Sequence, residues 1–111
     1  MIERGATLGD LERLIILAVL QCGKDAYGYT IQRELHGKIG RLVALGAIYT
    51  TLERLEQKGF VASEYAPSSS GRGGRPKRLF TVQGSGVNAL SETHREWKEL
   101  AAGLESILGI A

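Results

Sequence analysis

The chain has 111 residues, 43% of them hydrophobic and 23% charged, which fits one globular domain and excludes wholesale disorder. Its single cysteine, Cys22, excludes an internal disulfide framework and is typical of a reducing compartment. Residues 1–83 carry 12 Lys and Arg against 8 Asp and Glu, whereas the remainder carries 2 against 4, so the basic front favours a polyanionic partner.

The first predicted helix begins after Thr7, where Thr-x-x-Asp resembles a capping box, and ends at Gly23. Its apolar residues recur at helical spacing and cover much of its circumference, which indicates burial from more than one side, the second side being another subunit. The main face consists of Leu11, Leu14, Ile15, Ala18, Val19 and Cys22. The apolar run is about a third of a membrane span and lacks the cationic start of a signal peptide, so we expect a cytoplasmic protein with no membrane partner.

A second helix is predicted from a cap at Asp25 to about His36, with Gly37 as its stop. Its core-facing positions are Tyr27, Ile31 and Leu35. The outward polar side chains near its start are suitable phosphate ligands, although a merely solvated face is the alternative. They are Tyr29, Thr30 and Arg33.

A short strand is predicted at Arg41–Val43 and a third helix at Leu45–Lys58. The third helix has a narrow apolar stripe of Ile48, Leu52 and Leu55. At 100° per residue, the outward positions are Thr50, Arg54 and Gln57, with Tyr49 on the flank. A thin core stripe with outward polar side chains is typical of the recognition helix of a helix-turn-helix.

Two alternating strands, Phe60–Tyr65 and Lys77–Val82, are predicted to form a hairpin around a long tip. Residues 71–78 hold four cations and three glycines, so a flexible basic loop is expected to follow a phosphate backbone. Four phosphate contacts would give a log–log salt slope of about −3.6. The stretch also resembles an AT-hook core interrupted by a glycine, which makes minor-groove insertion of Arg72 or Arg75 a hypothesis and a solvated loop its alternative.

The last predicted helix spans Ser85–Leu108 and carries a heptad seam suited to packing against another helix. We expect it to form a homodimer, with an intramolecular core helix as the alternative. Trp97 lies in mid-seam and offers a flat apolar wall for an aromatic ligand, unless it only fills the interface. The seam consists of Val87, Leu90, His94, Trp97, Ala101, Leu104 and Leu108.

Catalytic and metal-binding patterns are absent from the sequence. His36 and His94 are the only histidines, no residue cluster has metal-ligand spacing, and the Gly-x-x-x-x-Gly-Lys-Ser pattern of nucleotide-binding loops does not occur. We therefore expect no enzyme activity, no cofactor and no metal.

In order and spacing, the motifs resemble the PadR family of bacterial transcriptional regulators, in its small form with one C-terminal helix. The resemblance rests on Leu11-Glu12, Tyr27-Gly28-Tyr29-Thr30-Ile31, the stretch from Gly46 to Phe60, Gly74-Arg75-Pro76-Lys77, Gly86 with Leu90, and Trp97. It implies a dimeric winged-helix repressor of palindromic operators, released by phenolic acids or planar aromatic compounds that bind beside Trp97. Carried over by position, the groove-reading residues would be Tyr49, Thr50 and Arg54; phosphate contacts would come from Tyr27, Tyr29, Arg33, Arg72, Arg75 and Lys77.

The predicted fold is therefore mainly α with a small β-hairpin: a winged helix-turn-helix in residues 1–83 and a dimerisation helix in residues 84–111. The predicted function is a dimeric DNA-binding regulator. The alternative is a winged-helix protein-interaction module that does not bind DNA. Leu11 and Ile15 of the first helix are expected to join the C-terminal seam in the dimer interface.

Overall fold

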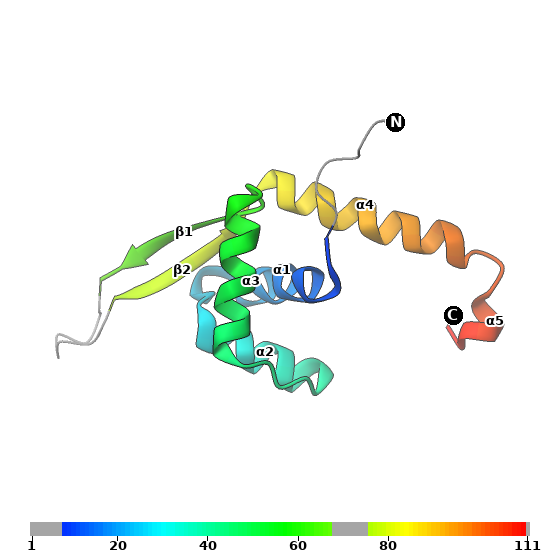
Figure 1. Cartoon of the computed structure of the whole chain (residues 1–111). Coiled ribbons are helices and arrows are strands. Elements are labelled where there is room, and N and C mark those ends of the chain that lie inside the picture. The colour runs from blue at the N-terminus through cyan, green and yellow to red at the C-terminus, as the bar shows by residue number, and fades with distance from the viewer. Residues whose placement is uncertain (1–7, 68–75, 111) are drawn as a thin grey trace.

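The computed structural model describes residues 8–67 and 76–110, and Figure 1 shows their arrangement. Three helices pack together, a two-stranded antiparallel hairpin extends from one side of them, and a long helix extends from the other. The fold class predicted from the sequence, mainly helical with one hairpin, is confirmed. The elements in chain order are α1 (Asp10–Cys22), the short 3-10 helix η1 (Gly23–Asp25), α2 (Gly28–Ile39), α3 (Leu45–Gln57), β1 (Val61–Ala66), β2 (Lys77–Val82), α4 (Gly84–Ala101) and α5 (Glu105–Leu108).

Helix α1 begins later than predicted. Gly9 is its N-cap, and the Gly9 amide donates a hydrogen bond of 2.8 Å to Oε1 of Glu12. The acidic residue of the capping box is thus Glu12 rather than Asp10. The predicted cap, Thr7, lies outside the described residues. Gly23 ends the helix as predicted, with a φ of 59°.

The predicted limits of α2 were wrong at both ends. Asp25 belongs to the 3-10 turn, and Tyr27 is the N-cap instead. Thr30 completes a capping box, because its Oγ1 accepts from the Tyr27 amide at 3.0 Å and donates to the Asp25 carbonyl at 2.6 Å. Gly37 remains helical because Gly40, in the left-handed region with a φ of 68°, supplies the stop.

The predicted strand at Arg41–Val43 was also wrong. This segment is an irregular connection, and the described residues contain one sheet, formed by β1 and β2 alone. The Val43 carbonyl accepts a hydrogen bond of 2.9 Å from the Gln32 side chain, so it is satisfied without a strand partner.

The hairpin and α3 match their predicted patterns closely. Val61 pairs with Val82 and Ser63 with Phe80, which places the buried side chains of both strands on one face. The Phe80 amide donates to the Ala26 carbonyl at 2.8 Å, so β2 is hydrogen-bonded to the segment before α2. The core beneath these elements consists of Ile15, Ile16, Ala18, Val19, Ala26, Ile31, Leu35, Ile48, Leu52, Leu55, Phe60, Val61 and Phe80.

The prediction of one continuous final helix was wrong. Helix α4 ends at Ala101, and Gly103, with a φ of 87°, turns the chain before α5. The carboxylate of Glu105 accepts from the Gly103 amide at 3.1 and 3.2 Å, which closes the turn. Leu104 and Leu108 therefore follow a break in the seam.

Helix α4 projects from the three-helix core (Figure 1). The chain measures 57 × 34 × 21 Å, and its radius of gyration of 16.2 Å exceeds the roughly 13 Å of a compact chain of this length. At its base, Gly86 lies against the Phe60 carbonyl, where a Cβ would collide. Among the described residues, no helix combines the length and apolar character needed to cross a membrane.

Candidate nucleic-acid interface

Helix α3 presents two different faces, as the sequence pattern predicts. Ile48, Leu52 and Leu55 are fully buried. Thr50, Arg54 and Gln57 are exposed on the opposite side. The helix is thus held in the core by a narrow stripe, which leaves a polar face available to a partner.

Tyr49 joins α3 to the first turn of α2. Its half-buried ring lies so close to Gly28 that a Cβ there would stand 2.5 Å from the Tyr49 hydroxyl. The centroid of the ring is also 6.4 Å from that of Phe80. The contact with Gly28 was missed by reasoning from the pattern of α3 alone, because the glycine lies on another helix.

The start of α2 gathers several of the predicted phosphate ligands. The Lys77 ammonium lies 4.6 Å from the centroid of the Tyr27 ring, and the Arg33 guanidinium lies 5.7 Å from that of Tyr29. The first turn carries no acidic residue, so the positive end of the helix dipole and its free amides are not neutralised locally. Thr30 is different, since its hydroxyl is already hydrogen-bonded to the Tyr27 amide and the Asp25 carbonyl.

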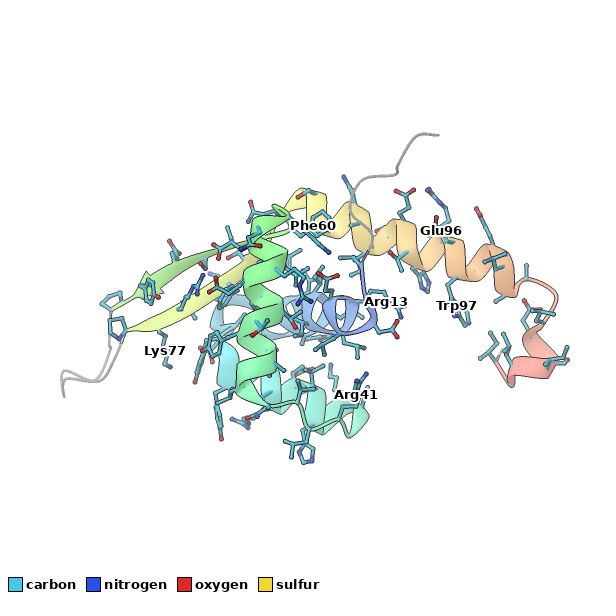
Figure 2. All side chains as sticks on the ribbon, viewed as in Figure 1. Arg13, Arg41, Phe60, Lys77, Glu96 and Trp97 are labelled. Atoms are coloured by element: carbon cyan, nitrogen blue, oxygen red, sulfur yellow. The ribbon has the colours of Figure 1, made fainter. Side chains whose placement is uncertain are left out.

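The cations of the hairpin fall into three groups. Lys77 is exposed at the start of β2 and is labelled in Figure 2. Arg72 and Arg75 lie outside the described residues. Arg78, one of the four cations counted in the basic stretch, is bound to two acidic residues of α3, Glu53 and Glu56, at 2.7 Å each.

A groove of about 580 Å³ lies between α1 and α4. The Trp97 side chain points from α4 toward the side on which Arg13 lies (Figure 2), and it is 48% exposed. The apolar walls are completed by leucines of both helices. The groove is lined by Arg13, Leu14, Leu17, Leu90, Ser91, Thr93, His94 and Trp97.

The predicted dimer residues differ in how much surface they retain. Val87, Leu104 and Leu108 are 42–47% exposed and His94 is exposed, whereas Leu11 and Leu90 are half-buried against the core. Ile15 is fully buried within the chain and Ala101 is nearly so, so the prediction that Ile15 meets a partner is corrected. Leu17 and Leu20 of α1, both nearly half exposed, retain the surface that Ile15 lacks.

A buried ion pair that the sequence pattern did not reveal connects α1 to the end of α3. Nζ of Lys58 lies 3.0 and 2.8 Å from the two carboxylate oxygens of Glu12, whose residue is only 5% exposed. Burial alone would raise the pKa of Glu12, but hydrogen bonds from the Gly9 amide and Lys58 outweigh it and lower the pKa. The sequence does contain a sign of this pair, because Glu12 lies three and four residues before Ile15 and Ile16 and therefore on the apolar face of the helix.

Cys22 has the properties of a structural thiol. It is partly buried, and burial raises its pKa, so the unreactive protonated form predominates at neutral pH. The described residues contain no group of three or more potential metal ligands.

Comparison with known proteins settles the family. Residues 16–92 match the family described as "Transcriptional regulator PadR-like family". The chain belongs to this family. Its members are transcriptional regulators rather than enzymes, and the resemblance expected from the motifs is confirmed. Comparison with curated proteins gives no match.

Solved structures of PadR-type regulators share this fold. A PadR-like transcription factor from Bacteroides fragilis is 29% identical, with a TM-score of 0.72 over 87% of this chain and 88% of that one. A PadR family regulator from Clostridium difficile is 26% identical, with a TM-score of 0.70 over 90% and 99% of the two chains. Bacillus subtilis PadR in complex with operator DNA matches at 22% identity, with a TM-score of 0.63 over 75% of this chain and 45% of that one.

Proposed function

We propose that this PadR-like regulator is a homodimeric repressor that binds a palindromic operator. The observation that carries the proposal is the exposed polar face of α3 beside the uncompensated start of α2 and Lys77 of β2. These elements together combine groups that read bases with groups that bind phosphate. A related fold, that of Bacillus subtilis PadR, has been solved with operator DNA.

Within this proposal, Thr50 and Arg54 read base edges in the major groove, and Tyr49 contacts the groove wall. Arginine is suited to this role because its planar fork can bind guanine in two places. Phosphates are bound by the start of α2 and by the hairpin. Thr30 contributes indirectly, because its hydroxyl holds the first turn of α2 in place. The residues assigned to phosphates are Tyr27, Tyr29, Arg33, Arg72, Arg75 and Lys77.

The dimer is formed by the projecting tail, α4 and α5. Its exposed apolar side chains would be costly to leave in water, and the nearby surface of α1 offers Leu17 and Leu20 as partners. A two-fold axis would then present two copies of α3 to half-sites about 34 Å apart, one turn of DNA.

The groove beside Trp97 is the proposed effector site. Its volume of about 580 Å³ is in the range of small-molecule sites, and its walls combine an indole ring and leucines with the polar groups of Arg13 and His94. A phenolic acid or planar aromatic compound suits this lining. Binding next to the dimer surface would change the separation of the two α3 helices and release the DNA.

The test is binding to duplex DNA from the region upstream of the protein's own gene, measured over a series of salt concentrations. Arg54→Ala should weaken binding about tenfold to a hundredfold while the oligomeric mass stays the same. Arg95→Ala, which removes an exposed arginine from α4, is the matched control and should bind like the wild type. Salt-independent or absent binding by the wild type would instead favour a protein-interaction module.

The effector proposal is tested in the same titration. A phenolic acid that does not itself bind DNA should quench Trp97 fluorescence and weaken the complex over the same concentration range. Quenching with unchanged DNA affinity would contradict control by this ligand class.

A further inference from the structure

The sequence places Arg78 in a basic stretch that is expected to contact phosphate, but its surroundings are acidic. Its Nη1 lies 2.7 Å from Oε1 of Glu53 and its Nη2 lies 2.7 Å from Oε1 of Glu56. Its Nε donates to Oγ of Ser63 at 3.1 Å. Three of the five N–H donors of the guanidinium are therefore already used within the protein.

The remaining surroundings also restrict Arg78. One face of the guanidinium lies 5.0 Å from the centroid of the Phe80 ring, and the side chain is only 22% exposed. Ser63 in turn donates to Oε2 of Glu56 at 2.8 Å, which closes a network of four polar side chains. With one cation and two carboxylates, the network carries a net charge of −1 and would repel a phosphate.

The members of this network come from three different elements. Glu53 and Glu56 lie on α3, Ser63 on β1 and Arg78 on β2. The bonds from Arg78 to α3 therefore connect the hairpin to the helix that carries Thr50 and Arg54. Arginine is suited to this because its flat, forked head makes several hydrogen bonds in fixed directions.

We propose that Arg78 is a positioning residue that fixes the angle of the hairpin relative to α3, and that it does not contact DNA. The inference rests on the proposed DNA-binding function and deepens it. In a complex, the hairpin and α3 must reach the DNA together, so a fixed angle removes the entropy cost of aligning them upon binding.

Lys77 provides a matched comparison one residue away. It is exposed, it lies over the Tyr27 ring, and the structure shows no ion pair for it among the described residues. The two neighbouring cations thus differ in role: Lys77 is available to phosphate, whereas Arg78 is held by the protein.

The salt dependence of DNA binding separates the two roles. Each cation that neutralises a phosphate contributes about 0.9 to the log–log slope. Lys77→Gln should therefore weaken binding and reduce the slope by about 0.9. Arg78→Gln should weaken binding about tenfold with the slope unchanged, because the loss is one of alignment. A slope reduced by about 0.9 in Arg78→Gln, or unchanged affinity, would overturn the inference.

A second measurement tests whether Arg78 acts through α3. When Glu53→Gln and Glu56→Gln are already present, adding Arg78→Gln should change the affinity less than twofold. An undiminished tenfold loss in that background would mean that Arg78 acts elsewhere. Arg78→Lys should recover part of the affinity in the otherwise unchanged protein, since lysine can pair with one carboxylate.

A third measurement uses the wild-type protein alone, so its result does not depend on whether a variant folds. The Nε–H resonance of Arg78, followed by NMR, should keep its position and slow exchange when DNA is added. A large shift on DNA binding would indicate phosphate contact and overturn the inference. Absence of salt-dependent binding by the wild type would reject the proposed function itself, whereas binding with a reduced Arg78→Gln slope would reject this inference alone.

Discussion

The two ends of the molecule differ in the surface side chains that they carry. At one end, formed by α3, β1 and β2, polar groups pair with one another across elements, as in the network of Arg78. At the other end, the tail of α4 and α5 leaves large apolar side chains in solvent. The exposed side chains of the tail include Val87, Trp97, Leu100, Leu104, Ile107, Leu108 and Ile110.

This difference indicates what each end requires. The α3–hairpin end reaches its final geometry within one chain, because its contacts are made by its own residues. None of the residues that the structure describes covers the apolar face of the tail, and in the proposed dimer a second copy of the chain would cover it. Substitutions in the tail and at the contact between α2 and α3 separate these requirements, and a third substitution tests the core that carries both ends.

The largest effect is expected from a charge placed in the tail. Trp97→Lys should dissociate the proposed dimer and weaken operator binding by at least about a hundredfold, because the dimer interface would bury an unpaired charge and each half-site would then be bound singly. Analytical ultracentrifugation and a DNA-binding titration measure the two effects.

Glu99→Lys is the matched control for this substitution, since it introduces the same side chain on the opposite face of α4. It should leave the mass of the assembly unchanged. A dimer that survives Trp97→Lys would show that the tail is not the interface.

The contrast between the two ends was partly predictable from the sequence. The stripe of Ile48, Leu52 and Leu55 was predicted from its helical spacing and is buried, because burial follows the period of the backbone. The alternation of β2 predicted which of its side chains share a face. The same period did not reveal the break before α5. Apolar spacing reports which face is covered, whereas the left-handed turn at Gly103 is a property of the backbone.

Pairings between distant residues could not be predicted from local patterns. Lys58 and Glu12 are 46 positions apart, and Arg78 and Glu53 are 25 positions apart. The local density of positive charge therefore predicted that Arg78 contacts phosphate, whereas in the folded chain Arg78 is paired with Glu53 and Glu56 of α3. The start of α2 was misplaced for a local reason: Asp25 is taken into the 3-10 turn, and Tyr27 becomes the N-cap, with its amide bonded to Thr30.

An intermediate effect is expected at the contact between α2 and α3. Gly28→Ala would place a methyl group against the Tyr49 ring. The ring is half-buried at the end of a side chain and can yield, so we expect a stability loss of only about 1 kcal/mol. DNA affinity should fall about tenfold because Tyr49 is displaced, while the oligomeric mass stays that of the wild type.

A Tyr49→Ala background provides the control, since no ring is then present to collide with the methyl group. Gly28→Ala should have little further effect on DNA affinity there. A full tenfold loss in that background would show that Gly28 itself contacts DNA rather than acting through Tyr49.

The smallest effect is expected at the Glu12–Lys58 pair, which belongs to neither exposed end. Because hydrogen bonds outweigh burial and lower the pKa of Glu12 below its ordinary value of 4.5, its charged form stabilises the fold. This contribution is fully present above pH 4.5 and is lost as the pH falls through the lowered pKa of the folded state. Glu12→Gln should therefore reduce the free energy of unfolding by about 1 kcal/mol near pH 7, and the difference from wild type should shrink in acid.

Chemical denaturation at one fixed protein concentration, between about pH 3 and pH 7, measures this difference. Glu64→Gln, at an exposed position on β1, is the control and should change the free energy of unfolding by less than about 0.5 kcal/mol throughout. A Glu12→Gln deficit that persists unchanged in acid would assign the loss to packing rather than to charge. If the oligomeric mass and the DNA affinity are also unaffected, the pair stabilises the core that carries both ends and takes no part in what either end binds.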